Sequence, residues 1–354
     1  NDASISGLTV GKGGGAVSSN TAVGNGALQA NTTGVETTAV GYRAAYSNTT
    51  GNSNSAFGRY ALYSNIDGSS NASFGYNSLY ANTSGSNNTA YGVQSLVNNT
   101  TASNNTAVGY QALYSNTTNG PNTAVGYLAG YANTGVGFIQ AFGARALQAN
   151  TTGQYNNAFG YQALVANTTG SYNTSIGDQS LYSNTTASNN TAVGYQAGYG
   201  TTTGGSNTTL GYTAGYNIGG GVRNTYLGSY SAANQSQGGN DNTGVGYATL
   251  NNVSSGSNNV AVGTSALQAN TTASNNTAVG YQAGYSNTTG AMTAVGYQAG
   301  YSNTTAQGQV WVGYAAGYAN TGNDNTGVGV QALVSNTTGS SNTALGRSAG
   351  YTNS

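Results

Sequence analysis

The segment N-T-A-V-G-Y-Q-A-L-Y-S-N-T-T at residues 105–118 decides the fold, because variants of it recur along almost the whole chain of 354 residues. Its glycine occurs once in every repeat and so marks the repeat length; we call these residues the ruler glycines. They are Gly24, Gly41, Gly58, Gly75, Gly92, Gly109, Gly126, Gly143, Gly160, Gly177, Gly194, Gly211, Gly228, Gly246, Gly263, Gly280, Gly296, Gly313, Gly329 and Gly346. Of the nineteen intervals sixteen are 17 residues, one is 18 and two are 16. Such constancy predicts stacked coils, since each residue must lie above its counterpart one turn below.

The three unequal intervals have predictable positions. The 18-residue interval contains the irregular segment Ser231–Gly239, and the two 16-residue intervals lose a residue near Thr-Gly bends. An insertion is tolerated only where it leaves the stacked columns in register. We therefore expect these changes to lie in bends.

The alternation in Val-Gly-Tyr-Gln-Ala-Leu-Tyr favours strands over helices, because Gly, Thr, Val, Tyr and Asn at this density are poor helix formers. Each coil is therefore predicted to hold two short strands joined by Asn/Gly/Ser bends. The predicted fold class is all-β, a parallel β-solenoid or β-roll of about 20 coils with a 17-residue repeat.

Small residues dominate the predicted interior. The third position after the ruler glycine holds only Ala, Ser or Thr, and the position before it is always apolar. A thin interior buries little apolar surface, so a lone solenoid would be marginal. We expect the Val/Phe, Leu and Tyr columns to pack between chains.

Two tyrosine columns are the leading candidates for a surface or inter-chain aromatic ladder. One follows the ruler glycine directly: Tyr42, Tyr76, Tyr110, Tyr127, Tyr161, Tyr195, Tyr212, Tyr247, Tyr281, Tyr297 and Tyr314. The other lies five residues after it: Tyr46, Tyr63, Tyr80, Tyr114, Tyr131, Tyr182, Tyr199, Tyr216, Tyr285, Tyr301 and Tyr318. Stacked aromatic rings stabilise a sheet, and exposed ones bind carbohydrate or polymer chains, so both roles are open.

An asparagine column lies seven residues after the ruler glycine, usually before Thr-Thr. Its members include Asn31, Asn48, Asn82, Asn116, Asn150, Asn167, Asn184, Asn270, Asn287, Asn303 and Asn336. Asn favours turns, and stacked Asn amides hydrogen-bond along a solenoid, so a turn ladder is expected rather than a binding surface. Many of these residues are also Asn-X-Thr/Ser glycosylation sequons.

Composition excludes most chemistry. The chain has six basic and six acidic residues, no Cys and no His. It therefore has no thiolate or imidazole with which to build a catalytic pair or a zinc site. The sequence Gly238-Gly239-Asn240-Asp241 resembles a calcium-solenoid motif but occurs once. We expect no catalytic residues, no metal and no cofactor, and hence no enzyme.

Charge and hydropathy limit the partners. The formal net charge is zero, which argues against nucleic-acid binding. No run of about 18 apolar residues is present, so no membrane insertion is expected.

The repeated A-V-G-Y-Q-A element and Ser175-Ile176-Gly177 resemble the head repeats of YadA-like trimeric autotransporter adhesins. The full unit also resembles shafts of phage tail fibres, which often end in an endosialidase-type intramolecular chaperone. The resemblance covers about residues 20–354. It implies a left-handed β-roll, a homotrimer, and a cell-surface or virion fibre outside the cell.

Two segments follow from the repeat: a non-repeat stretch at residues 1–19, which could cap the solenoid or contact another subunit, and tandem repeats at 20–354. The chain begins without Met and stops within a repeat, from which we expect a processed or partial product. The predicted function is a structural and adhesive extracellular fibre that attaches to surface glycans or matrix. The alternatives are a filament subunit docking end to end and, from the Thr-Thr pairs, an ice-binding solenoid.

Overall fold

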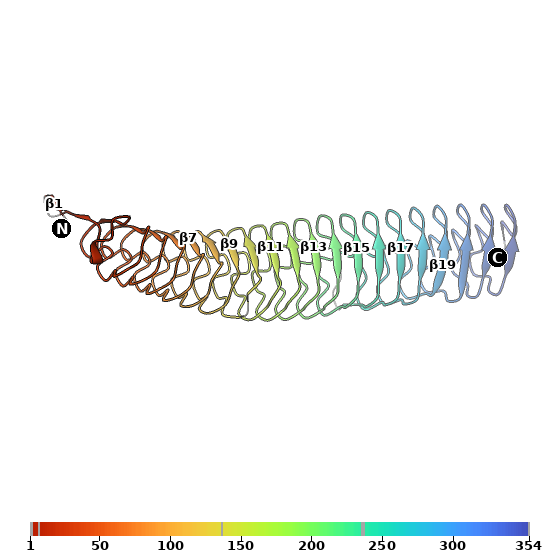
Figure 1. Cartoon of the computed structure of the whole chain (residues 1–354). Coiled ribbons are helices and arrows are strands. Elements are labelled where there is room, and N and C mark those ends of the chain that lie inside the picture. Colours follow the sequence, from red (N-terminus) through yellow and green to blue (C-terminus); the bar gives the residue numbers. More distant parts are fainter. Residues whose placement is uncertain (1–2, 6–7, 136, 235–237, 353–354) are drawn as a thin grey trace. The chain divides into compact units, whose positions relative to one another are not determined.

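The computed structural model describes all residues except 1–2, 6–7, 136, 235–237 and 353–354. It forms two compact units, residues 1–175 and 176–354. In each unit successive coils stack in chain order to form a parallel β-solenoid (Figure 1). Within the described residues there is no α-helix, and so none that could cross a membrane; the one helical turn is a 3-10 turn, η1 (Gly14–Ala16). The prediction of an all-β parallel solenoid with a 17-residue repeat is confirmed.

Unit 1 carries one short strand in each coil. Its strands are β1 (Ala3–Ile5), β2 (Leu8–Gly11), β3 (Thr21–Val23), β4 (Thr38–Val40), β5 (Ser55–Phe57), β6 (Ala72–Phe74), β7 (Thr89–Tyr91), β8 (Thr106–Val108), β9 (Thr123–Val125), β10 (Gln140–Phe142) and β11 (Asn157–Phe159). From β3 onward each strand pairs in parallel with the next at equivalent repeat positions, as in Ala107 opposite Ala124. The strand β12 (Thr174–Ile176) lies at the boundary between the units.

Unit 2 keeps the same register through its irregular intervals. Its strands are β13 (Thr191–Val193), β14 (Thr208–Leu210), β15 (Thr225–Leu227), β16 (Thr243–Val245), β17 (Val260–Val262), β18 (Thr277–Val279), β19 (Met292–Val295), β20 (Gln309–Val312), β21 (Thr326–Val328) and β22 (Thr343–Leu345). Thr225 pairs with Thr243 across the 18-residue interval, and Thr277 pairs with Thr293 across a 16-residue one. Neither the added residue of the 18-residue interval nor the lost residue of the 16-residue interval therefore falls within a strand. Part of the segment expected to hold the insertion, residues 235–237, lies outside the described residues.

The prediction of two strands per coil is wrong, because the segment after the ruler glycine is a series of turns. In the coil of Gly109, Gln111 and Leu113 have φ values of 53° and 51°, in the left-handed region. The backbone still bonds to both neighbouring coils: the Gln111 N–H donates to the Val93 carbonyl at 3.0 Å, and the Leu113 N–H to the Ala129 carbonyl at 3.0 Å. Left-handed residues thus continue the ladder without an extended strand.

The prediction that the Leu column packs between chains is also wrong. Leu62, Leu96 and Leu113 are fully buried inside the coils of unit 1, beside the Ala columns of the strands and turns. A left-handed conformation costs a non-glycine residue about 1–2 kcal/mol, whereas burying a Leu side chain stabilises by about 1.5–3 kcal/mol. Burial outweighs strain, so the turn directs Leu inward and the core is larger than the small-residue columns suggest.

The ruler glycine is required by close stacking of the backbone. Gly109 has φ of 135°, and a Cβ there would lie 2.4 Å from the carbonyl oxygen of Gly126 in the next coil. Only glycine adopts this φ readily and avoids the overlap. The residue that set the repeat length is thus the point of closest approach between coils.

In unit 2 a large residue takes the place of a small one in the core, and glycines around it make the space. The sequence analysis missed this feature. Trp311 is fully buried in a strand position that holds Ala in most coils. Glycines lie around its ring: a Cβ on Gly317 would lie 2.2 Å from the Trp311 Cδ2 atom, and one on Gly327 would lie 2.8 Å from Cζ3. Because protein interiors are close-packed, the ring fits only where neighbours lack side chains.

The N-terminal segment folds back on the first coil. Strand β2 pairs antiparallel with β1 and with β3, placing Val10 opposite Val23. The Gly24 N–H donates to the Thr9 carbonyl at 2.8 Å. These bonds occupy backbone groups of β3 that would otherwise lie at a free sheet edge.

Candidate binding surface

The predicted asparagine column lies in the interior, not on a surface. From Asn48 onward in unit 1 the column amides donate to the side chain one coil earlier, as Asn48 Nδ2 does to Asn31 Oδ1 (3.1 Å) and Asn65 Nδ2 to Asn48 Oδ1 (2.7 Å). Most of these amides also donate to a carbonyl three residues later, as Asn48 does to Gly51 (3.0 Å). Asn82, Asn116, Asn150 and Asn167 are fully buried in the same column.

The same column in unit 2 is buried but less continuous. The amides of five of its members bond to the carbonyl three residues on; these are Asn184, Asn270, Asn287, Asn303 and Asn336. The amide of Asn287 reaches Asn276 Oδ1 at 3.3 Å instead of the equivalent residue one coil earlier. Asn287 belongs to the coil that begins the first 16-residue interval, Gly280 to Gly296.

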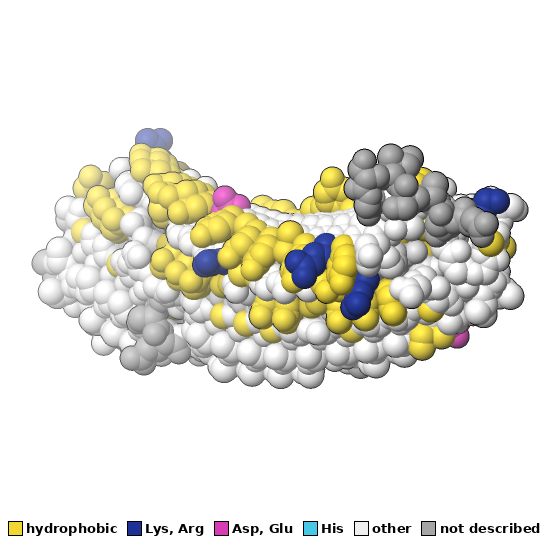
Figure 2. Space-filling view, turned by 90° about the vertical axis from the view of Figure 1, so that its left-hand side faces the viewer, with side chains coloured by type: hydrophobic (Ala, Val, Ile, Leu, Met, Phe, Trp, Pro, Cys, Tyr) yellow, Lys and Arg dark blue, Asp and Glu magenta, His cyan; other side chains and the backbone are white. Residues whose placement is uncertain are grey.

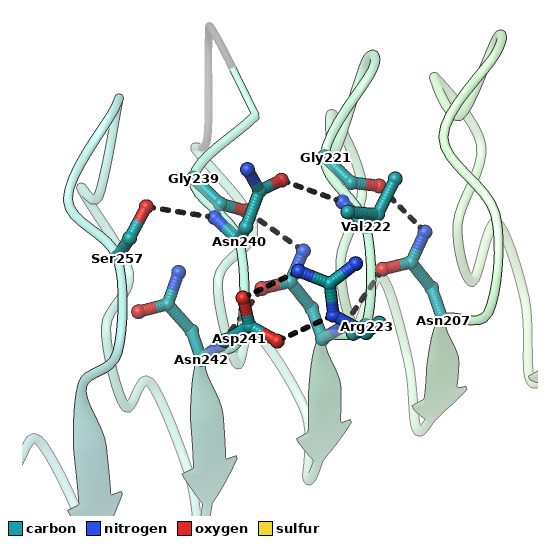
Figure 3. Close-up of polar contacts among 10 residues, drawn as sticks. Asn207, Gly221, Val222, Arg223, Gly239, Asn240, Asp241, Asn242 and Ser257 are labelled. Atoms are coloured by element: carbon teal, nitrogen blue, oxygen red, sulfur yellow. Dashed lines mark hydrogen bonds and ion pairs between the residues drawn. The ribbon is translucent and has the colours of Figure 1, made fainter.

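A second asparagine ladder, four residues before the ruler glycine, was not singled out from sequence. In Figure 3, Asn207, Gly221, Gly239 and Asn242 belong to this ladder of unit 2. The Asn207 amide donates to the Gly221 carbonyl, and the Asn242 amide donates to the Gly256 carbonyl, both at 2.8 Å. The fixed Asn at the start of each N-T-A-V element was its signal.

Burial gives the sequons a structural meaning. The Asn48 side chain is fully buried, with its nitrogen bonded to two oxygens. A glycan attached to Nδ2 would displace at least one of these bonds and would need space that the stacked coils fill. Glycosylation of this column is incompatible with the folded coil.

The tyrosines directly after the ruler glycine form an outward-facing row, which we call the outer row. All eleven candidate residues are exposed, with exposed fractions from 40% at Tyr42 to 54% at Tyr247. Neighbouring rings stack where consecutive coils carry Tyr, as in Tyr110–Tyr127 (5.5 Å between centroids) and Tyr297–Tyr314 (5.0 Å). The outer row therefore presents ring surface and hydroxyl groups to solvent.

The tyrosines five residues after the ruler glycine are half-buried and form the inner row. Their rings stack almost in parallel, with Tyr182–Tyr199 at 4.8 Å and 4° and Tyr301–Tyr318 at 5.0 Å and 5°. Each such pair contributes about 0.5–1.5 kcal/mol beyond its area burial. The stacking joins coils of one chain, which accounts for the inner row without a second chain.

A column of amides separates the two rows. The Gln111 amide donates to Gln94 Oε1 at 2.8 Å in unit 1, and the Gln298 amide donates to Gln282 Oε1 at 2.8 Å in unit 2. Aromatic faces supply contact area and nearby polar groups fix the orientation of a ligand, so the two together suit a binding surface. We call the outer row, the amide column and the inner row together the tyrosine face.

Sequence analysis missed several aromatic residues outside the two columns. Tyr60 and Tyr230 lie in the amide column, where each meets an outer-row ring edge-on. Phe138, Tyr155 and Tyr172 form a separate stack five residues before the ruler glycine, with 5.0 Å between successive centroids. Their signal was an aromatic residue at the same repeat position in three consecutive coils.

Burial raises the pKa of Tyr199, and its stacked neighbours Tyr182 and Tyr216 raise it further. The pKa of Tyr301 is raised in the same way, first by burial and then by Tyr318 and Tyr285. A tyrosinate between two stacked rings loses solvation and gains a like-charged neighbour once that neighbour ionises.

Alkaline pH is therefore expected to destabilise the protein. A raised folded-state pKa means that the neutral form stabilises the fold, fully below the unfolded Tyr pKa of about 10 and progressively less above it. Urea unfolding at pH 8, 9, 10 and 11, with Tyr ionisation followed by absorbance, should show constant stability to about pH 9 and then a loss. A free energy of unfolding that stays constant up to pH 11 would contradict the raised pKa values of Tyr199 and Tyr301. The chain has only one Lys, so Tyr dominates titration in this range.

The aspartate of the isolated calcium-like motif, Asp241, forms an ion pair with Arg223. The Asp241 carboxylate accepts from Arg223 Nε at 2.6 Å and from Nη2 at 2.8 Å (Figure 3). The hydrogen bond from Arg223 lowers the pKa of Asp241. Both side chains are exposed to solvent, which screens the pair, so its net effect on stability is small.

Comparison with known proteins finds no family model that matches the chain and no curated protein that matches it significantly.

Proposed function

We propose that the chain is a structural and adhesive extracellular fibre protein, a shaft that attaches through its tyrosine face to surface glycans or matrix polymers. The observation that carries the proposal is the outer row, in which all eleven candidate tyrosines are exposed. Repetition of one weak site at a fixed spacing gives avidity, because each contact raises the effective concentration for the next.

The interior supports a role as a shaft. Backbone bonds run from coil to coil on both sides of each turn, and two buried asparagine ladders reinforce them. Few ion pairs are needed to hold such a stack, so ionic strength has little effect on it. Neutral, hydrogen-bonded coils suit a fibre exposed to varying salt outside the cell.

Self-association of three chains is part of the proposal. The apolar residue before each ruler glycine faces outward in unit 1, and Phe57, Phe74 and Tyr91 stack along the surface (4.9 and 5.7 Å). Apolar stripes of this kind favour contact with another protein surface. A native mass of three times 35.2 kDa is expected. The mass of one chain would contradict self-association, and a series of larger multiples would favour the end-to-end filament.

The threonine pairs do not favour the ice-binding alternative. In several pairs the first hydroxyl donates to a carbonyl of the next coil, as Thr32 Oγ1 does to Thr49 (3.0 Å) and Thr49 Oγ1 to Ile66 (3.0 Å). That proton is therefore not available to order water. Thermal hysteresis above a buffer control would revive the alternative.

Adhesion can be tested by replacing all eleven outer-row tyrosines with Ser. Retention on immobilised glycans is expected to fall at least tenfold, because the sugar rings lose the aromatic faces against which they stack and a total loss of about 1.4 kcal/mol is already tenfold. A control variant carries Thr→Ser changes at exposed second threonines, including Thr50, Thr101 and Thr289. Equal retention of both variants and the parent would refute adhesion through the tyrosine face.

A further inference from the structure

One part of the tyrosine face in unit 1 differs from the rest, because two arginines lie among six tyrosines. This arginine–tyrosine cluster comprises Tyr42, Arg43, Tyr46, Arg59, Tyr60, Tyr63, Tyr76 and Tyr80. Figure 2 shows Lys and Arg side chains among others coloured as hydrophobic, a class that includes Tyr. The cluster exists because Arg replaces the usual Tyr or Gln at two neighbouring repeat positions.

Both guanidinium groups lie over aromatic rings. The Arg43 Cζ atom is 5.3 Å from the centroids of Tyr42 and Tyr46, so it bridges the outer and inner rows. The Arg59 Cζ atom is 5.0 Å from the centroid of Tyr60 and 5.9 Å from that of Tyr42. A hydrogen bond to Tyr60 also holds the Arg59 guanidinium. These contacts position the two groups and still leave further N–H donors on each guanidinium for a ligand.

Neither arginine pairs with a carboxylate. In the described part of the chain the ion pair found is Arg223–Asp241, which lies in unit 2. Arg59 is exposed and Arg43 is half-buried. The cluster thus combines two fixed, uncompensated positive charges with ring faces and phenol hydroxyls, on a chain whose formal net charge is zero.

We propose that the arginine–tyrosine cluster binds an acidic polysaccharide through the carboxylates of its uronate units. The planar guanidinium matches a carboxylate with two parallel N–H donors, and the tyrosine rings stack against the apolar faces of the sugar rings. This inference rests on the proposed adhesive function and specifies the ligand class at one site.

The charge density of the cluster favours a polysaccharide over a nucleic acid. A nucleic-acid strand carries a phosphate about every 3.4 Å, and its affinity depends on neutralising several of them. The cluster offers two cations and many hydroxyl and ring contacts. A polysaccharide that carries at most one carboxylate per sugar, together with hydroxyl groups and apolar ring faces, complements that composition better.

The chain supplies its own matched comparisons. Gln94 and Gln111 occupy the Arg43 position in later coils with φ of 58° and 53°, close to the 52° of Arg43, so Arg43→Gln suits the local backbone. Arg145 lies at the same repeat position, is exposed, and has Ala144 and Gln148 where the cluster has tyrosines. In the described residues the cation–ring contacts are made by Arg43 and Arg59. Arg145→Gln therefore removes one charge from the tyrosine face outside the arginine–tyrosine cluster, beside the outer-row residue Tyr127.

The test measures binding of the full chain to soluble polygalacturonate, with uncharged dextran, dextran sulfate and single-stranded DNA as comparison probes. The parent is expected to bind polygalacturonate most tightly. The double variant Arg43→Gln/Arg59→Gln should bind it at least tenfold more weakly and bind dextran unchanged, whereas Arg145→Gln should stay within twofold of the parent.

Three results would overturn the inference. The double variant could keep full affinity for polygalacturonate while the outer-row Ser variant loses it, which would leave adhesion intact but remove the acidic site. The parent could bind dextran as tightly as polygalacturonate. Dextran sulfate or DNA could bind more tightly than polygalacturonate, in which case affinity follows charge density alone.

Discussion

Replacing the ruler glycine Gly109 by Ala is expected to destabilise the protein by about 3 kcal/mol. Two effects combine: a φ of 135° strains any L-residue, and the new Cβ would lie 2.4 Å from the Gly126 carbonyl oxygen. The atom it meets is backbone, so relief requires moving the next coil. Urea unfolding followed by circular dichroism measures the loss.

A control for the Gly109 change lies two residues further on. Gln111→Ala places Ala at φ of 53°, a conformation that Ala248 and Ala315 already adopt at the same repeat position. Its cost should stay below about 1 kcal/mol, since it is a half-buried substitution without a backbone clash. If Gly109→Ala costs no more than this control, close backbone stacking does not explain the glycine column.

Removing one buried asparagine should be nearly as costly. In Asn65→Ala the chain loses bonds from the Asn65 amide to Asn48 Oδ1 (2.7 Å) and the Gly68 carbonyl (2.8 Å), and the bond it accepts from Asn82 (2.8 Å). Buried groups left without partners cost about 1–3 kcal/mol each, so a loss of about 3 kcal/mol is expected. Networked amides also polarise one another, which adds to the effect.

The matched control is Asn25→Ala, since Asn25 is exposed. Its change in unfolding free energy should lie within about 0.5 kcal/mol of zero. The two variants can be compared by the same urea titration. A buried-ladder variant as stable as the exposed one would show that the Asn amides contribute nothing net to the stack.

The site was predictable in part. Both tyrosine columns were visible in the sequence, because a fixed spacing places identical residues one above another. The arginine–tyrosine cluster was not, since Arg43 and Arg59 belong to different columns and only the stacking of adjacent coils puts both beside the Tyr42 ring. The second asparagine ladder was overlooked because Asn in N-T-A-V reads equally well as a turn residue.

By itself, the sequence determined the coil length, the stacking and the register, since a backbone ladder repeats only if each coil has the same number of residues. The tertiary structure decided which way each side chain points. Left-handed residues such as Leu113 convert the expected second strand into turns and place Leu inside, because burial outweighs the strain. It also decided that Trp311 lies against Gly317 and Gly327, because the space for its ring is shared by two neighbouring coils and no single repeat specifies it.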